Sequence, residues 1–242
     1  MDSLTMAAAA GLRARMESLE LLANNLANAS TAGYKADREF YDLYRSPEAA
    51  ASPDVARLPL IEKPWTDYSQ GTLTATGNPL DLSLDGRGFF SVDGPGGVLY
   101  TRGGGLRLAR DGTLATPEGY PLRNAGGRPV RLDPALPFEI ARDGAVRQSG
   151  QELARLAVTD FPQPDALVKK GGNYFHMTDP AAPGRRSAAE VHQGAIENAN
   201  FNSAESAVRL VSVLRQFEML QRALALGGEM NRRAVEEVAR VS

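Results

Sequence analysis

Apolar side chains recur at intervals of three or four residues near the start of the chain. Intervals of four, three, four and three residues are the a/d pattern of a helix that packs along another helix. This pattern predicts a helix from residue 3 to about residue 32, with an apolar stripe that Leu22 widens. The stripe comprises Leu12, Met16, Leu19, Ala23 and Leu26.

Three amide side chains, Asn24, Asn25 and Asn28, interrupt this stripe near the end of the predicted helix. Asparagine is a poor helix former and is costly to bury without hydrogen-bond partners. In one interpretation the amides lie in water or cap the helix end. In the other they form hydrogen bonds between helices and fix the register of a bundle. Gly33 follows as a residue suited to the left-handed conformation that ends a helix.

A second long helical pattern occupies the other end of the chain, from about residue 203 to residue 240. Asn202 or Ser203 can cap this helix, and Gly227-Gly228 weakens it or allows a close approach. Val211 and Leu220 broaden its apolar stripe, and Gln221 is a polar interruption at a d-like position. The stripe consists of Leu210, Leu214, Phe217 and Leu224.

Between these helices, residues 71 to about 195 consist of short apolar or alternating runs separated by turn dipeptides. Asp111-Gly112 and Asp143-Gly144 are typical of tight turns between antiparallel strands. The regular spacing predicts an antiparallel sandwich or barrel. The expected strands include 80–84, 89–92, 98–101, 106–108, 129–132, 138–140 and 153–161.

Prolines recur about every six residues between residues 36 and 70 and favour extended chain over a long helix. Asp37 to Tyr44 has Phe40, Leu43 and Tyr44 on one helical face, which predicts a short helical turn. Trp65 is the one tryptophan of the chain. It is interpreted either as an anchor of this segment on the following domain or as an aromatic contact to a neighbouring subunit.

Together these patterns predict an α+β protein in which the N- and C-terminal helices pair as a coiled-coil domain and bracket an all-β antiparallel middle domain. The expected divisions are 1–35 for the first helix, 36–76 for a proline-rich linker, 77–195 for the β domain and 196–242 for the second helix. Both helical stripes are wider than one partner can cover. We therefore expect helices of other copies to complete the bundle.

Composition excludes several functional classes. The chain has 242 residues, a net charge of −2, no cysteine and two histidines, His176 and His192. This balance does not favour nucleic acid as a partner, and the lack of cysteine excludes disulfides and thiolate metal sites. No run reaches the ~20 apolar residues of a membrane span, and the N-terminus lacks the pattern of a cleaved secretory signal.

Candidate catalytic groups are weak. Asp81 and Asp85 could pair as acid and base, but a strand and a turn explain them without chemistry. Gly103 to Gly105 lacks the Lys-Ser/Thr of a phosphate-binding loop. The sequence therefore predicts no enzyme activity, no cofactor and no metal site.

Several motifs resemble those of the bacterial flagellar axial proteins of rod and hook. The N-terminal signature is Leu22 to Lys35, and the similarity spans nearly the whole chain in family order. The opening Met1-Asp2 and the segment Arg215 to Met219 are most similar to the proximal rod subunits that precede the distal rod. The further motifs are Gly77–Asp81, Asp85–Phe90, Tyr100–Arg102, Asp111–Leu114, Gly119–Leu122 and Gly194–Asn200.

The resemblance implies that both terminal helices form the inner coiled coil of a tube, with the β domain outside. It also implies export by the flagellar type III apparatus and assembly with other copies and neighbouring rod subunits. The location would be the periplasmic rod, which transmits torque from motor to hook. In this setting the asparagines are favoured as register-fixing groups of the bundle.

Two alternatives remain open at this stage. The chain could be a distal rod or hook subunit of the same axial structure. In a different class, it could be a monomeric secreted β-domain binding module, while a glycosidase on a β scaffold would need a cluster of ionisable groups that the sequence does not offer. Deletion of residues 1–30 distinguishes them, because a binding module would keep its activity.

Overall fold

The computed structural model describes residues 3–39, 41–44, 58–61, 64–178 and 184–241. The chain divides into two compact units, each of which is described by itself. Unit 1 comprises residues 1–27, 37–66 and 202–242, and unit 2 comprises residues 28–36 and 67–201. The chain is α+β, and the strands of the described residues pair antiparallel, which confirms that part of the predicted fold class.

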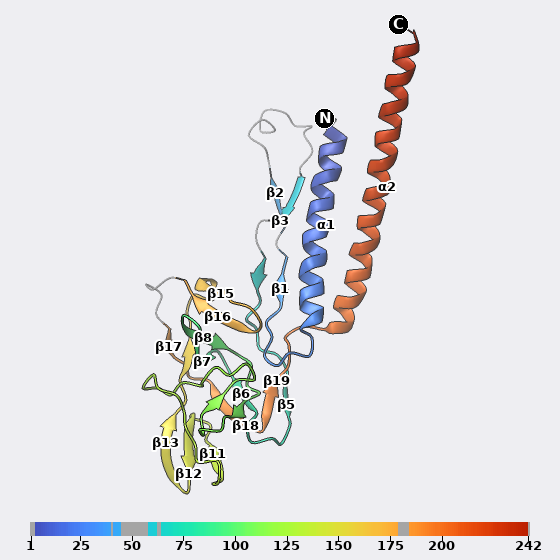
Figure 1. Ribbon diagram of the computed structural model, residues 1–242. Helices are drawn as coiled ribbons and strands as arrows, with labels where there is room; N and C mark the ends of the chain where they lie inside the picture. The colour runs from blue at the N-terminus through green and yellow to red at the C-terminus, as the bar shows by residue number, and fades with distance from the viewer. Residues whose placement is uncertain (1–2, 40, 45–57, 62–63, 179–183, 242) are drawn as a thin grey trace. The chain divides into compact units, whose positions relative to one another are not determined.

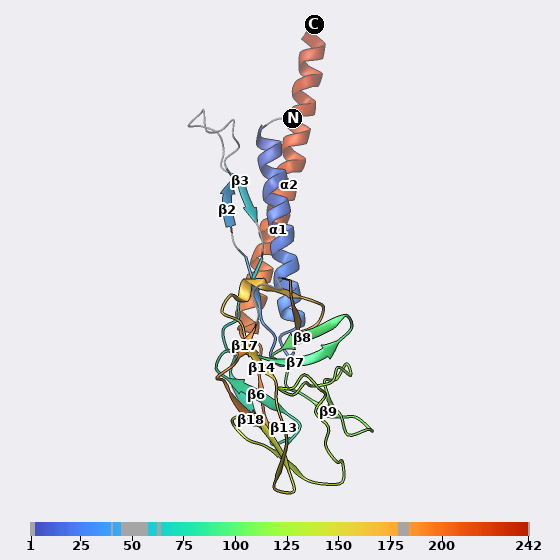
Figure 2. The same cartoon turned by 90° about the vertical axis from the view of Figure 1, so that its left-hand side faces the viewer.

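Unit 1 contains the two long helices, which run antiparallel and side by side (Figures 1 and 2). A Cβ atom built at Gly11 would lie 3.7 Å from Leu220 Cδ1, which places the middle of one helix against the middle of the other. The elements of unit 1 are α1 (Ser3–Ala27), β1 (Asp37–Arg38), β2 (Tyr41–Tyr44), β3 (Leu58–Ile61), β4 (Trp65–Thr66) and α2 (Ser203–Val241).

Both predicted helices are present, with one change at an end. α1 stops at Ala27, whereas the pattern predicted about residue 32. The chain turns after Asn28, whose carbonyl oxygen accepts the N–H of Thr31 at 3.0 Å, and the N–H of Gly33 donates to Glu197 instead of continuing the helix. α2 runs unbroken through Gly227-Gly228 to Val241. Asn202 caps α2, since its Oδ1 accepts the backbone N–H groups of Ala204 at 3.0 Å and Glu205 at 3.3 Å.

The predicted helical turn between Asp37 and Tyr44 is wrong. Tyr41–Tyr44 forms β2, which pairs with β3 in the register Tyr41↔Ile61 to Tyr44↔Leu58. Tyrosine and leucine fit a strand once a partner is present, and tertiary pairing overrides a weak helical pattern. Phe40 and the prolines at 47 and 53 lie outside the described residues.

Unit 2 is built of short antiparallel strands (Figure 1). These strands enclose one main core of apolar side chains. Its largest sheet has six strands in the order β15-β16-β8-β7-β14-β17. Its elements are β5 (Leu73–Ala75), β6 (Leu82–Asp85), β7 (Phe89–Gly94), β8 (Gly97–Thr101), β9 (Arg107–Leu108), β10 (Leu114–Ala115), β11 (Phe138–Ile140), β12 (Ala145–Gln148), β13 (Gln151–Arg155), β14 (Val158–Asp160), the short helix η2 (Pro164–Ala166), β15 (Leu167–Lys169), β16 (Tyr174–Met177), β17 (Arg185–Arg186), β18 (Glu190–Gln193) and β19 (Ala195–Glu197).

Most of the predicted strands of the middle region are present, with two differences. Residues 129–132 contribute isolated bridges, Arg123↔Pro129 and Thr113↔Arg131, in place of a strand. The predicted run 153–161 is divided between β13 and β14. The core contains Leu82, Phe90 and Leu122, each no more than 1% exposed, so the apolar positions of the alternating runs do face inward.

Candidate functional site

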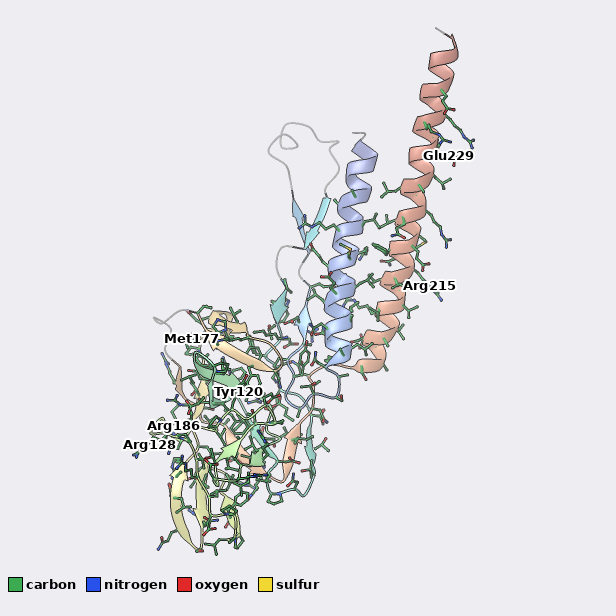
Figure 3. The ribbon with its side chains drawn as sticks, in the orientation of Figure 1. Tyr120, Arg128, Met177, Arg186, Arg215 and Glu229 are labelled. Atoms are coloured by element: carbon green, nitrogen blue, oxygen red, sulfur yellow. The ribbon has the colours of Figure 1, made fainter. Side chains whose placement is uncertain are left out.

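α2 carries apolar side chains on two opposite sides. The helix can be found in Figure 3 by the labels of Arg215 and Glu229. One side is a stripe with intervals of three and four residues, Leu210, Val213, Phe217, Leu220 and Leu224, whose members are buried or half-buried. The other side holds Val208, Met219, Leu226 and Met230, which are 71%, 60%, 62% and 71% exposed. At 3.6 residues per turn these four residues share one side of the helix.

The predicted assembly residues fall into distinct environments within the chain. Leu22 and Asn25 are buried, and Met16, Asn24, Leu214 and Gln221 are exposed. The half-buried ones are Leu12, Leu19, Leu26, Asn28, Leu210, Phe217 and Leu224. No contact between copies is described, so their role in assembly stays a prediction.

The buried face of α1 differs from the stripe seen in the sequence. It consists of Ala14, Ser18, Leu22 and Asn25, at 5%, 0%, 7% and 6% exposure. Apart from Leu22, its residues are small or polar, because this face receives strand backbone as well as α2. The larger apolar residues Leu12, Met16 and Leu19 are more exposed.

Asn25 binds the backbone of β1. Its Nδ2 donates to the carbonyl oxygen of Asp37 at 2.8 Å, and its Oδ1 accepts the backbone N–H of Asp37 at 3.0 Å. The side-chain amide thus imitates a neighbouring strand, which satisfies both its groups at a buried position. Within the chain these bonds go to a strand, whereas the sequence interpretation gave this amide a partner on another helix.

Glu39, two residues after Asp37, joins both long helices. Its Oε1 accepts a hydrogen bond from Ser18 Oγ on α1 at 2.5 Å, and its Oε2 accepts one from Arg209 Nη2 on α2 at 2.9 Å. The side chain of Glu39 is 4% exposed. A buried carboxylate needs such charge-assisted bonds to offset its lost hydration. Glu39 was not predicted from the sequence, because nothing in its neighbourhood marks it as a partner of Arg209.

A buried ion triad lies in unit 2. Glu197 Oε1 accepts from Lys35 Nζ at 2.6 Å, and Glu197 Oε2 accepts from Arg102 Nε at 2.8 Å. These side chains are 0%, 1% and 3% exposed. Burial lowers the pKa of Lys35 below 10.5, and the charge of Glu197 opposes that change.

Further bonds surround this triad. Arg102 Nη1 donates to the carbonyl oxygens of Gly86 at 2.9 Å and Gly88 at 2.8 Å. Lys35 Nζ donates to the carbonyl oxygen of Ser69 at 2.6 Å, and Glu197 Oε1 also accepts the N–H of Gly71 at 2.9 Å. With its charges paired and its remaining groups hydrogen-bonded, the triad can be held in the interior.

The segment Ala32–Ala36, called the strap below, is held in unit 2 by groups from distant parts of the chain. The N–H of Gly33 donates to the carbonyl oxygen of Glu197 at 2.6 Å. Asn173 Nδ2 donates to the carbonyl oxygen of Ala32 at 2.6 Å, and Lys169 Nζ lies 4.6 Å from the centre of the Tyr34 ring. The motifs around Lys35, Arg102 and Glu197 therefore meet at one place in the fold.

The carboxylates considered for catalysis have structural partners. Asp81 accepts hydrogen bonds from Thr76 Oγ1 at 2.7 Å and Asn78 Nδ2 at 3.1 Å, and Asp85 accepts one from Gln70 Nε2 at 3.3 Å. These bonds stabilise the turns that flank β6. Trp65 pairs with Arg38 between β4 and β1 and is 48% exposed, and both interpretations of it stay predictions.

Two further features of the described residues concern metal binding and membrane-spanning helices. In those parts of the chain no group of three His, Cys, Asp or Glu side chains is placed to hold a metal ion. Among the same residues, no helix combines the length and the apolar character that crossing a bilayer requires. The described residues define an α+β class of protein, in which two long helices carry outward apolar side chains and a β unit is held by buried charges.

Three family models match successive parts of the chain. A flagella basal body rod protein model matches residues 7–35, a flagellar hook protein FlgE/F/G D1 domain model matches residues 83–148, and a flagellar basal body rod FlgEFG protein C-terminal model matches residues 192–237.

Curated relatives match over nearly the full length. The chain is 32% identical to the flagellar basal-body rod protein FlgF of Mesorhizobium japonicum over 219 residues, which is 90% of this chain and 89% of that protein. It is 28% identical over 227 residues to FlgF of Caulobacter vibrioides, with 93% of each covered, and 28% identical to the rod protein FlgG of Buchnera aphidicola, with 91% and 94% covered. The chain belongs to the flagellar basal-body rod protein family, which confirms the resemblance seen in the sequence.

Proposed function

We propose that this chain is a structural subunit of the flagellar basal-body rod, and that it polymerises through its terminal helices. In the assembled state α1 and α2 form a coiled coil, and coiled coils of many copies build a tubular axle that transmits torque from motor to hook. The observation that carries this proposal is the outward side of α2, with four apolar side chains at least 60% exposed.

The energetic argument concerns that side of α2. Burying an exposed leucine, methionine or valine side chain contributes about 1.5–3 kcal/mol. α1 already covers the opposite stripe of α2, so the gain from Val208, Met219, Leu226 and Met230 requires another molecule. For a polymer this contact must be heterologous: the outward side of α2 in one copy packs against a different surface of the next copy, and repetition of that contact extends the assembly without an enzyme.

The proposal includes the route and the partners. The subunit is exported by the flagellar type III apparatus and assembles with other copies and neighbouring rod subunits in the periplasm. It has no catalytic role and takes no cofactor. A proximal rod position is proposed from the opening Met1-Asp2 and the segment Arg215 to Met219, with a distal rod or hook position as the alternative within the same structure.

The test places a charge on the outward side. Met219→Lys and Leu226→Lys are expected to abolish swimming and leave basal bodies with truncated rods and no hook, as seen by electron microscopy, because a lysine cannot be buried unpaired between copies. Glu218→Lys is the matched control, since it adds the same side chain at an exposed position that is not apolar. Full-length rods in both apolar-site variants would contradict the proposal.

A further inference from the structure

We propose that the outward side of α2 packs against the exposed side of α1 in a neighbouring copy. This inference rests on the proposed function and deepens it, because it names the surface that receives the outward side of α2. Both surfaces belong to unit 1 of the chain.

The exposed side of α1 has the spacing of a helix-packing surface. Its residues follow one another at intervals of four, three, four, three and four, which places them on one side of the helix, opposite the buried face. The largest apolar member, Met16, is 50% exposed. The members of this exposed side are Ala9, Arg13, Met16, Glu20, Ala23 and Ala27.

The outward side of α2 has a similar spacing. Between its four apolar residues it continues through Ser212, Arg215 and Arg222, which are also exposed and follow at intervals of three or four residues. Figure 3 shows Arg215 on the side of α2 that faces away from α1. Each helix therefore offers a second packing surface in addition to the one it uses within the chain.

The two surfaces are complementary in side-chain size. The outward side of α2 presents valine, leucine and two methionines, whereas the exposed side of α1 contains three alanines. Large side chains of one helix fit the spaces that small side chains leave on another helix. Two outward sides of α2 in contact would instead oppose large side chains to each other.

The two surfaces are also complementary in charge. Arg13 Nε lies 3.1 Å from Glu17 Oε1 within α1, so Glu20 gives the exposed side of α1 a carboxylate beyond that pair. The outward side of α2 contributes Arg215 and Arg222, and over residues 208–230, which are all described, it contains no Asp or Glu. Contact between α1 and α2 of different copies would place opposite charges together, and contact between two α2 sides would gather arginines alone.

Such a contact joins different surfaces of the two copies, so it is heterologous and can repeat without closing into a dimer. Along the series of copies, each α1 would lie between its own α2 and the α2 of a neighbour.

Charge reversal tests the pairing in cells. Glu20→Arg should reduce the number of basal bodies with complete rods at least about tenfold, because it places like charges together. Adding Arg215→Glu or Arg222→Glu to the same chain should restore at least about half of them. Arg232→Glu, at an exposed position on another side of α2, is the matched control and should restore none. Complete rods in Glu20→Arg alone, or no rescue by either change on the outward side, would overturn the proposal.

Cross-linking tests the contact directly, because the natural chain has no cysteine. Copies with Met16→Cys are produced together with copies that carry Met219→Cys or Leu226→Cys, and isolated basal bodies are oxidised. One of these combinations should give a mixed disulfide dimer, and Met16→Cys with Glu218→Cys should give at most about a tenth as much. Dimers between Met219→Cys copies without mixed dimers would show that α2 sides meet each other and would overturn the proposal.

Failure of this proposal can be told apart from failure of the proposed function. If Met219→Lys blocks rod formation while Glu20→Arg does not, the chain is a rod subunit whose α2 packs on a surface other than α1. If complete rods form in both variants, the proposed function fails as well.

Discussion

At the scale of single residues, the triad of Glu197, Lys35 and Arg102 shows how the balance of buried charges determines which substitution lowers stability most. One carboxylate lies between two cations, all three nearly fully buried. Loss of a partner from a buried ion pair is costly mainly because an uncompensated charge stays in the interior. The three side chains are therefore not equivalent, although they belong to one network.

Glu197→Gln is expected to lower the free energy of unfolding by about 3–5 kcal/mol, because two buried cations lose their only shared carboxylate within the triad. Lys35→Met should cost about 1–2 kcal/mol, since the bonds to Ser69 and Glu197 are lost but Glu197 keeps Arg102 as its charged partner and the N–H of Gly71 on Oε1. Urea denaturation of the two variants measures the order. A larger loss for Lys35→Met would contradict this account.

Two glycines with similar φ angles allow the cost of a positive φ to be distinguished from the cost of a steric clash at Cβ. Gly33 has φ of 68° and Gly77 has φ of 72°, but a Cβ at Gly33 would lie 2.2 Å from the carbonyl carbon of Arg102, whereas nothing lies within 4 Å of one at Gly77. Gly77→Ala should cost about 1–2 kcal/mol from φ alone, and Gly33→Ala about 2–5 kcal/mol because backbone must also move. Equal losses in thermal unfolding would show that the close approach of the strap to Arg102 is not rigid.

At the scale of elements, the buried face of α1 contacts the strand β1 as well as the helix α2. The buried positions Ser18 and Asn25 are polar because β1 and the residue that follows it need hydrogen-bond partners there. An edge strand with unpaired backbone groups is otherwise exposed to wrong pairing. The asparagine therefore protects β1 within the same unit.

A graded pair of substitutions tests the role of Asn25. Asn25→Asp keeps the acceptor for the N–H of Asp37 but loses the donor to its carbonyl oxygen, whereas Asn25→Leu loses both. We expect hydrogen exchange at the Asp37 amide to accelerate about fivefold to tenfold in Asn25→Leu and less in Asn25→Asp, as the loss of a hydrogen bond of about 1 kcal/mol predicts. Equal exchange in all three proteins would exclude this role.

The spacing of apolar residues predicted the two long helices well, but it did not predict which strands pack against α1. The spacing from Leu210 to Leu224 and the turn at Asp143-Gly144 are local features, so the sequence reveals them directly. The face that α1 buries depends on β1 and β3, which have no local signal of their own. The spacing of the larger apolar side chains therefore predicted a different buried face. Lys35, Arg102 and Glu197 lie far apart in the sequence, and only the family motifs marked their neighbourhoods.

At the scale of the whole molecule, the division into two units makes removal of the N-terminus informative. The strap belongs to the β unit and not to the helix that precedes it. A deletion that ends before residue 28 therefore removes α1 alone, and one that ends after residue 36 also removes Lys35 and Gly33. The two deletions should have different effects on the β unit.

Deletion of residues 2–27 should leave the unfolding midpoint of the β unit unchanged and still prevent rod formation in cells. Deletion of residues 2–36 should lower that midpoint, because the bonds from the strap to Glu197, Asn173 and Lys169 are lost. Tyrosine fluorescence during urea unfolding and electron microscopy of basal bodies measure the two effects. Complete rods in the shorter deletion would show that α1 is dispensable.

The separation of Lys35 from Glu197 has a consequence for the timing of folding. These two residues are 162 positions apart. A chain that leaves a ribosome or a narrow channel with its N-terminus first would bring Lys35 out early and Glu197 near the end. During that interval Lys35 lacks the carboxylate of Glu197, and burying its charge without that partner is unfavourable. The β unit therefore stays unfolded until almost all of the chain has passed through.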